Sequence, residues 1–66
     1  MKATVNGEAR QVEEGTTLRA LVEALGLHPG AVAVAVNGEV VPRAEHAGRT
    51  VGEGDRVEVI RAVGGG

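Results

Sequence analysis

The sequence of 66 residues contains no cysteine and no phenylalanine, tyrosine or tryptophan. Without cysteine there are no disulfides, thiolate metal ligands or thiol nucleophiles, so ordinary packing must hold the fold together. Without aromatic residues the core must come from valine, leucine, isoleucine and alanine, and the stacking platforms that single-stranded nucleic acids favour are missing. The net charge of −2 provides no basic surface for phosphate backbones either. We therefore expect no nucleic-acid partner.

Long apolar runs are also missing. No stretch approaches the roughly 20 apolar residues that cross a bilayer, and the N-terminus lacks the basic region and apolar run of a signal peptide. We expect a cytoplasmic protein that does not enter a membrane. The length suits one small domain, because compact domains usually have about 50 to 250 residues.

Two Asn-Gly pairs predict two tight β-hairpins. Asn6-Gly7 and Asn37-Gly38 each follow a short β-compatible segment and can take the positive φ angles of a type I′ turn. Residues 32–36 form the clearest strand, since valine alternates with alanine there. A final strand is indicated by the alternation of polar and apolar residues near the C-terminus. The expected strands are residues 2–6, 9–12, 32–36, 39–41 and 56–62.

One amphipathic helix is predicted near residues 17–26. Its apolar residues recur at i, i+3, i+4 and i+7 and form one stripe. They are Leu18, Leu21, Val22 and Leu25. Thr16 or Thr17 can cap the start of the helix, and Gly26 can take the left-handed conformation that ends it. Residues 43–50 show no clean period and are expected to form an irregular connection with room for one helical turn.

Two hairpins, an intervening helix and a closing strand predict an α+β fold. The architecture that combines them is the β-grasp, or ubiquitin-like, fold, in which one main helix packs across one face of a mixed sheet of four to five strands. A small β-barrel is the alternative, and the strong central helix argues against it. We expect a β-grasp domain over residues 1–63 and a flexible glycine tail over residues 64–66.

The body of the sequence offers little that could form a catalytic centre. His28 and His46 lie far apart with no cysteine to complete zinc spacing, so each is expected to be a helix-end or loop histidine. The acidic residues within 13–14 and 53–55 stand beside glycines, where solvated turn carboxylates are expected. Residues 52–54 lack the Gly-Lys-Ser/Thr ending of a phosphate loop. We expect no catalytic residues, no metal and no bound cofactor.

The last three residues, Gly64, Gly65 and Gly66, suggest a function. Chain ends are often frayed, but a segment without Cβ atoms is slim, spans about 10 Å, and can follow the path that a partner imposes. The carboxylate at its tip is a poor electrophile, and the chain has no phosphate loop to activate it. An ATP-using enzyme would convert it to an acyl-adenylate, which would make the protein a substrate and carrier.

Motifs that match one known family are spread over the whole chain. They are residues 5–8 (Val-Asn-Gly-Glu), 14–18 (Glu-Gly-Thr-Thr-Leu), 32–43 (Val-Ala-Val-Ala-Val-Asn-Gly-Glu-Val-Val-Pro-Arg), 53–59 (Glu-Gly-Asp-Arg-Val-Glu-Val) and 63–66 (Val-Gly-Gly-Gly). Through them the chain resembles the ThiS family, the sulfur carriers of thiamine biosynthesis. The run ending in Val-Pro-Arg and the closing Gly-Gly are together fairly specific. His46 stands where family members often have tryptophan, and two closing glycines suffice in the family.

The resemblance implies a β-grasp fold and a reactive terminal glycine, here Gly66. A ubiquitin-activating-like adenylyltransferase (ThiF) would adenylate this glycine with ATP, and a cysteine desulfurase relay would supply sulfur to form a thiocarboxylate. Thiazole synthase (ThiG) would then use the thiocarboxylate to build the thiazole ring. Gly65 and Gly64 carry over as the slim segment that enters the partner active sites. The resemblance implies a carrier that is not an enzyme and binds no cofactor; we expect it to be a monomer when free.

Three alternatives share the expected fold. A ubiquitin-like modifier would form isopeptide bonds to lysines, carriers for molybdopterin or cysteine synthesis would share the terminal chemistry, and a plain interaction domain would have an inert tail. For the carrier, we expect partners to dock on the sheet face that points away from the helix, near the last strand and with Arg61 as a candidate contact, because the tail leaves the domain there.

Overall fold

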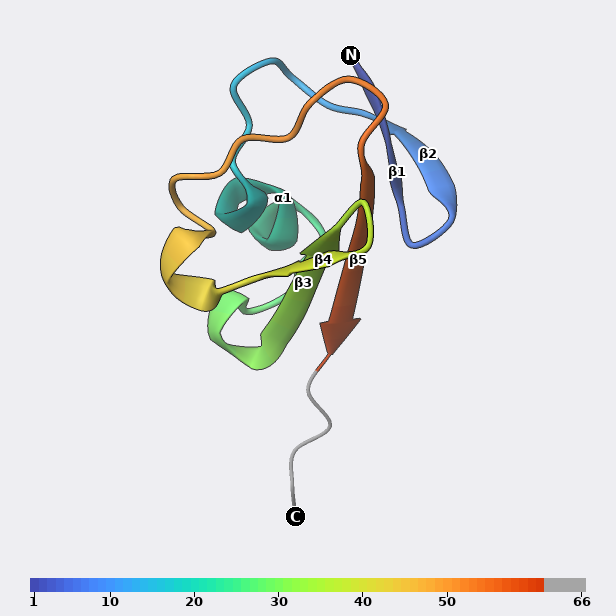
Figure 1. Cartoon of the computed structure of the whole chain (residues 1–66). Helices are drawn as coiled ribbons and strands as arrows, with labels where there is room; N and C mark the ends of the chain where they lie inside the picture. Colours follow the sequence, from blue (N-terminus) through green and yellow to red (C-terminus); the bar gives the residue numbers. More distant parts are fainter. Residues whose placement is uncertain (62–66) are drawn as a thin grey trace.

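The computed structural model describes residues 1–61 and contains a five-stranded sheet with one α-helix on one side of it (Figure 1). The strands are β1 (Lys2–Val5), β2 (Glu8–Gln11), β3 (Val32–Val36), β4 (Glu39–Val41) and β5 (Arg56–Arg61). The helix α1 spans Leu18–Ala24, and two short 3-10 turns, η1 (Pro29–Ala31) and η2 (Arg43–Glu45), precede and follow the β3–β4 hairpin. The predicted combination of one main helix with a sheet of four to five strands is confirmed.

The order of the strands in the sheet is β2-β1-β5-β3-β4, so the last strand in sequence lies at the centre. Strand β5 is parallel to β1 and antiparallel to β3, which makes the sheet mixed. The two hairpins, β1–β2 and β3–β4, lie on either side of β5. This topology is the predicted β-grasp fold.

Both hairpins turn at the predicted Asn-Gly pairs. Asn6 and Asn37 have φ angles of 50° and 52°, and the glycines that follow have φ angles of 84° and 86°. Two successive positive φ angles are what a type I′ turn requires, and asparagine and glycine adopt them most readily. Strand β1 ends at Val5, one residue earlier than predicted, because Asn6 belongs to the turn.

The helix α1 is shorter than the predicted 17–26 because the residues at both ends act as caps. The side-chain oxygen of Thr17 accepts a hydrogen bond from the backbone N–H of Ala20 at 3.1 Å, and Leu25 is the C-cap. Gly26 then takes the predicted left-handed conformation, with φ of 79°. The apolar stripe is confirmed, since Leu18, Leu21 and Val22 are buried.

The core lies between α1 and the sheet and consists mainly of valine. Its buried apolar side chains are Ala3, Val5, Val12, Leu18, Leu21, Val22, Val32, Val34, Val36, Val41, Val51, Val57 and Val59. Two of them, Val12 and Val51, lie outside the regular elements. Val51 is fixed by a hydrogen bond from its N–H to the carbonyl of Thr16 at 2.8 Å, which ties the irregular connection to the start of α1. As predicted, this connection contains a single helical turn, η2.

Candidate functional site

Strand β5 leads the chain toward the glycines that the sequence singled out. Gly64, Gly65 and Gly66 lie outside the described residues, and so does residue 62, where β5 was expected to end. Within the described part, β5 ends at Arg61, which is paired with Val32 at the start of β3. The candidate site is therefore the surface around the end of β5.

The asparagines of both hairpin turns hold β5 through side-chain hydrogen bonds. The Asn6 side chain accepts a hydrogen bond from the N–H of Val59 at 2.8 Å and donates one to its carbonyl at 3.2 Å. The Asn37 side chain accepts a hydrogen bond from the N–H of Arg56 at 2.9 Å and donates one to Asp55 at 3.0 Å. Side-chain hydrogen bonds from the two asparagines thus hold β5 at its start and at Val59. The Asn-Gly pairs predicted the turns but not these contacts with β5.

The sheet face opposite α1 carries an exposed apolar patch. Along β5, Val57 and Val59 are buried against the helix, so Ile60 projects from the other face, where it is 61% exposed. On β4, Val40 is 77% exposed and Val41 is buried. Ile60 is directly opposite Ala33 and Val40 is directly opposite Ala35, which makes the four side chains contiguous. We call Ala33, Ala35, Val40 and Ile60 the open-face patch.

The open-face patch lies where the sequence analysis expected partners to dock. The candidate contact Arg61 is exposed, but it follows Ile60 and by strand alternation belongs to the opposite side of the sheet. Ile60 is therefore the residue of β5 that presents an apolar side chain on the open face near the end of the strand. Sequence reasoning missed Ile60 and Val40, although both are apolar residues at positions that the strand period leaves outside the core.

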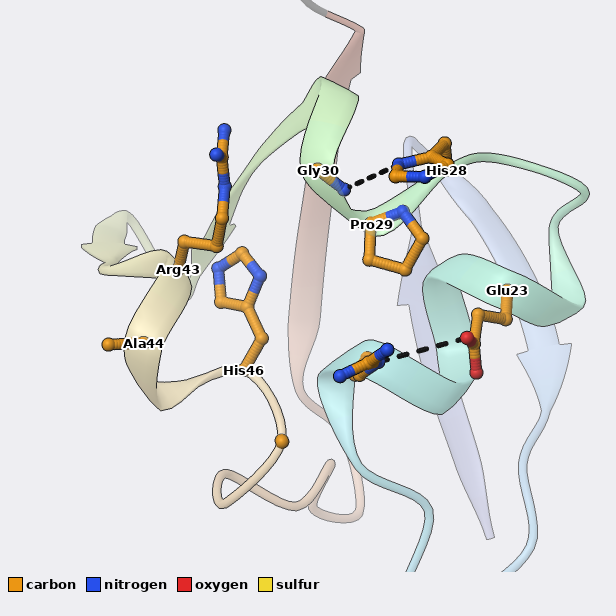
Figure 2. A pocket seen from close by; sticks show the side chains of 9 residues that line it. Glu23, His28, Pro29, Gly30, Arg43, Ala44 and His46 are labelled. Atoms are coloured by element: carbon orange, nitrogen blue, oxygen red, sulfur yellow. Dashed lines mark hydrogen bonds and ion pairs between the residues drawn. The ribbon is translucent and has the colours of Figure 1, made fainter.

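A cavity of about 470 Å³ lies between α1, η1 and η2 (Figure 2). Its lining includes Arg19, Glu23, His28, Pro29, Arg43 and His46. His28 caps η1, and its Nδ1 accepts a hydrogen bond from the N–H of Gly30 at 2.9 Å. His46 follows η2 and is only 3% exposed; its Nε2 lies 2.8 Å from the carbonyl oxygen of Val41. Both histidines are at helix ends, as predicted, but the fold brings them to one cavity.

The acidic residues within 13–14 and 53–55 lie in loops and turns, as predicted. Asp55 accepts a hydrogen bond from the N–H of Gly52 at 2.7 Å, and Glu53 accepts one from the N–H of Lys2 at 3.0 Å. These two carboxylates therefore stabilise the loop before β5 by accepting hydrogen bonds from backbone N–H groups. Across residues 1–61 no three histidine or acidic side chains are gathered as they would be at a metal site. The same residues include no helix with the length and apolar character needed to span a bilayer.

A helix across a mixed sheet, with the last strand central and an apolar patch on the open face, defines a small β-grasp protein. The sequence model of the ThiS family matches residues 3–66, and the chain belongs to this family. It is 32% identical to the sulfur carrier protein ThiS of Escherichia coli over 66 residues, which covers both proteins completely. It also superposes on the crystal structure of the thiamine biosynthesis protein ThiS from Geobacter metallireducens with a TM-score of 0.82, at 36% identity and with both chains fully covered.

Two longer proteins contain a segment similar to this chain. They are the thiazole synthases of Paramagnetospirillum magneticum and Magnetococcus marinus, which are 39% and 42% identical to it over 66 residues. The chain is covered completely, but it spans only 20% of the length of each of these relatives. In both relatives, therefore, a ThiS-like segment and the remainder of a thiazole synthase form one polypeptide.

Proposed function

We propose that this chain is a sulfur carrier in thiamine biosynthesis and that Gly66 is the residue that is adenylated and thiocarboxylated. The observation that carries the proposal is the match to the ThiS family, which extends through residue 66 over a complete β-grasp fold. The similarity to the sulfur carrier of Escherichia coli over the full length of both chains supports it. The protein acts as a co-substrate of other enzymes, and ATP is used by its partner.

The chemistry at Gly66 has two steps. The carboxylate attacks the α-phosphorus of ATP, and pyrophosphate leaves as the acyl-adenylate forms. The terminal sulfur of a persulfide, supplied by a cysteine desulfurase relay, then attacks the acyl carbon and displaces AMP, and a thiol reduces the resulting acyl disulfide to leave a thiocarboxylate. Gly65 and Gly64 lack side chains, so the segment before the reacting carbon can enter a narrow active site.

Two features of the chain limit side reactions of the activated acyl group. The sequence has no cysteine that could capture the acyl group as an internal thioester, and Lys2 is its single lysine. Lys2 begins β1, which runs parallel to β5 with Thr4 opposite Arg56. The lysine therefore lies beside the start of β5, at the end of the sheet opposite to the end of that strand.

The partners follow from the two steps and from the longer relatives. A ThiF-like adenylyltransferase performs the first step, and a ThiG-like thiazole synthase consumes the thiocarboxylate. The thiazole synthases that contain a ThiS-like segment support the second partner. The open-face patch suits docking because exposed contiguous apolar side chains commonly mark protein interaction sites.

Intact-mass analysis tests the proposal. The chain purified from a thiamine-starved native host should carry the mass increment of sulfur replacing oxygen, and fragmentation should locate it at Gly66. The same measurement establishes that Gly66 bears a free carboxyl group. Deletion of Gly66 should cause a requirement for thiazole, whereas an inert tail predicts none.

The same experiment separates the carrier from a ubiquitin-like modifier. Stable conjugates of Gly66 with lysines of other proteins, in place of the thiocarboxylate, would favour the modifier. Carriers for molybdopterin or cysteine synthesis would give the thiocarboxylate as well, but deletion of Gly66 would then leave thiazole formation unchanged.

A further inference from the structure

The cavity between η1 and η2 lies at the end of the sheet where β5 ends. Strand β3 begins at Val32, directly opposite Arg61, and η1 immediately precedes Val32. Strand β4 runs antiparallel to β3 and ends at Val41, so η2 follows at the same end. Figure 1 shows η1 beside the arrowhead of β5. An enzyme that receives the residues after β5 would therefore approach the end of the sheet at which this cavity lies.

The lining of the cavity favours an anion. Arg19 and Glu23 form an ion pair at 3.7 Å and compensate one another, whereas Arg43 makes no ion pair within residues 1–61. His28 adds a donor, because its Nδ1 already accepts the hydrogen bond from Gly30 and its neutral ring must then carry the proton on Nε2. The cavity thus has an excess of one positive charge in a chain with a net charge of −2.

His46 holds the wall that carries Arg43. Its Nε2–H donates to the carbonyl of Val41 at 2.8 Å, which fastens the residues after η2 to the end of β4. The other ring nitrogen, Nδ1, is buried and has no hydrogen-bond partner in the part of the chain that the structure describes. Figure 2 shows the ring of His46 projecting between Arg43 and Pro29. A buried imidazole nitrogen without a partner is unusual in folded proteins, but this atom is closed off from solvent and does not add a polar group to the cavity.

We propose that the cavity between η1 and η2 binds an aspartate or glutamate side chain of the enzyme that receives the glycine tail. Arg43 and His28 are the contacting groups, and His46 is a positioning residue that keeps Arg43 on the cavity wall. The proposal rests on the proposed function, because that function requires an enzyme to enclose the chain beyond β5. It adds a charged contact to the apolar docking on the open-face patch.

The exposure of the cavity favours a protein carboxylate over a free anion. Arg43 and His28 are exposed, so water screens their interaction with a small ion in solution. A partner surface that closes over the cavity removes this water and strengthens the interaction. The cavity has room for a carboxylate side chain, since its volume of about 470 Å³ greatly exceeds the roughly 30 Å³ of a water molecule.

Charge reversal of Arg43 tests the proposal. The Kd of wild type, Arg43→Glu and Arg10→Glu for the adenylyltransferase and the thiazole synthase of the same organism would be measured at low and high salt. Arg10→Glu is the matched control, because Arg10 is exposed on β2 at the far edge of the sheet and undergoes the same change of charge. We expect Arg43→Glu to weaken binding to at least one enzyme by about tenfold or more and to flatten its salt dependence, and Arg10→Glu to change it less than about twofold.

Arg43→Lys and a saturation experiment complete the test. Arg43→Lys should retain part of the affinity, because it keeps the charge but loses the planar fork. At saturating enzyme, Arg43→Glu should reach the thiocarboxylate yield of wild type, since Arg43 acts in docking. Thermal melting should be unchanged, because Arg43 is exposed.

Two results would overturn the inference. The first is equal affinity of Arg43→Glu and Arg10→Glu for both enzymes. The second is a saturable shift of the His28 and His46 imidazole signals in NMR with inorganic phosphate on the order of 1 mM or below, which would assign the cavity to a small phosphorylated ligand. Failure of the proposed function looks different, because wild type itself would then form no thiocarboxylate with the two enzymes.

Discussion

Asn6 shows how much a single residue contributes to the placement of β5. It occupies a positive φ angle of 50° and makes two hydrogen bonds to Val59, which lies 53 positions away in sequence. The β1–β5 ladder itself pairs only Thr4 with Arg56 and Val5 with Val57. The Asn6 side chain thus continues the pairing after β1 has turned away, and it satisfies backbone groups that would otherwise lack a partner on that edge.

Substitutions of Asn6 distinguish its part in the hairpin turn from its two side-chain hydrogen bonds to Val59. Asn6→Gly keeps the positive φ angle but removes both hydrogen bonds, so we expect a loss of about 1–3 kcal/mol in the free energy of unfolding. Asn6→Ala should cost roughly 1–2 kcal/mol more, because alanine is strained at positive φ. Urea denaturation measures both losses. The control is Glu8→Ala, which changes an exposed residue and should alter the free energy of unfolding by no more than about 0.5 kcal/mol. Equal stability of Asn6→Gly and wild type would show that the two hydrogen bonds to Val59 do not stabilise the fold.

At the scale of elements, α1 depends on its surroundings. It has seven residues, and isolated helices shorter than about 12 residues are marginal in water. The Thr17 cap satisfies one backbone N–H at its start, and the carbonyls of Arg49 and His46 accept hydrogen bonds from the N–H groups of Leu18 and Arg19. The irregular connection therefore completes the helix, and the buried stripe anchors it to the sheet.

Leu21→Ala should destabilise the protein through the cavity it leaves. Leu21 is 4% exposed and packs in the only α-helix of residues 1–61, so we expect a loss of about 2–5 kcal/mol. Small domains are marginally stable, and such a loss is a large share of the total. Thermal and urea unfolding measure the effect, with Ala20→Ser on the exposed side of α1 as a control that changes stability by about 0.5 kcal/mol. An unchanged melting temperature would mean that Leu21 does not pack as the structure places it.

At the scale of the whole molecule, the fold places an exposed apolar patch and a cavity near the end of one strand. Strand β5 is central and paired on both sides, the apolar patch covers part of the open face, and a cationic cavity lies at the end of the sheet where β5 ends. Docking and chemistry can therefore be tested by separate substitutions. The open-face patch and the cavity belong to the folded domain, whereas the proposed reacting carboxylate belongs to Gly66.

Gly65→Val should abolish adenylation and leave the domain folded. A β-branched side chain restricts the backbone and thickens the segment that, in the proposed function, enters the active site of the adenylyltransferase. Pyrophosphate exchange with the adenylyltransferase measures the reaction, and circular dichroism measures the fold. Normal exchange by the variant would contradict the proposed path of the tail, and Gly64→Ala provides a milder control.

Ile60→Asp should weaken docking without loss of stability. Ile60 is 61% exposed, so the substitution leaves no core cavity but places a charge in the open-face patch. We expect an increase in Kd of about tenfold for the adenylyltransferase, as for an apolar residue at the centre of an interface. The matched control is Glu58→Gln, which lies on the same face of β5. Unchanged affinity of Ile60→Asp would move the docking surface elsewhere.

Much of the fold was predictable because local rules determine it. The Asn-Gly turns, the stripe of Leu18, Leu21 and Val22, and the alternating strand 32–36 each follow from a few neighbouring residues, and all three are confirmed. The errors are at element ends, where capping decides. Strand β2 runs over Glu8–Gln11 and not 9–12, because Val12 leaves the strand while its N–H still bonds to the carbonyl of Met1 at 2.8 Å.

The amino-acid sequence by itself determined the β-grasp class, the two hairpins, the helix and the glycines on which the proposed chemistry depends, since each rests on residue type and short-range period. Only the tertiary structure decided which side chains meet across long sequence distances. Pairing of β5 with β1 and β3 brings Asn6 to Val59 and places the ends of η1 and η2 around one cavity with Arg43 and two histidines. These contacts arise from the packing of the whole chain, which buries the valine face of the sheet against α1, and no local pattern encodes them.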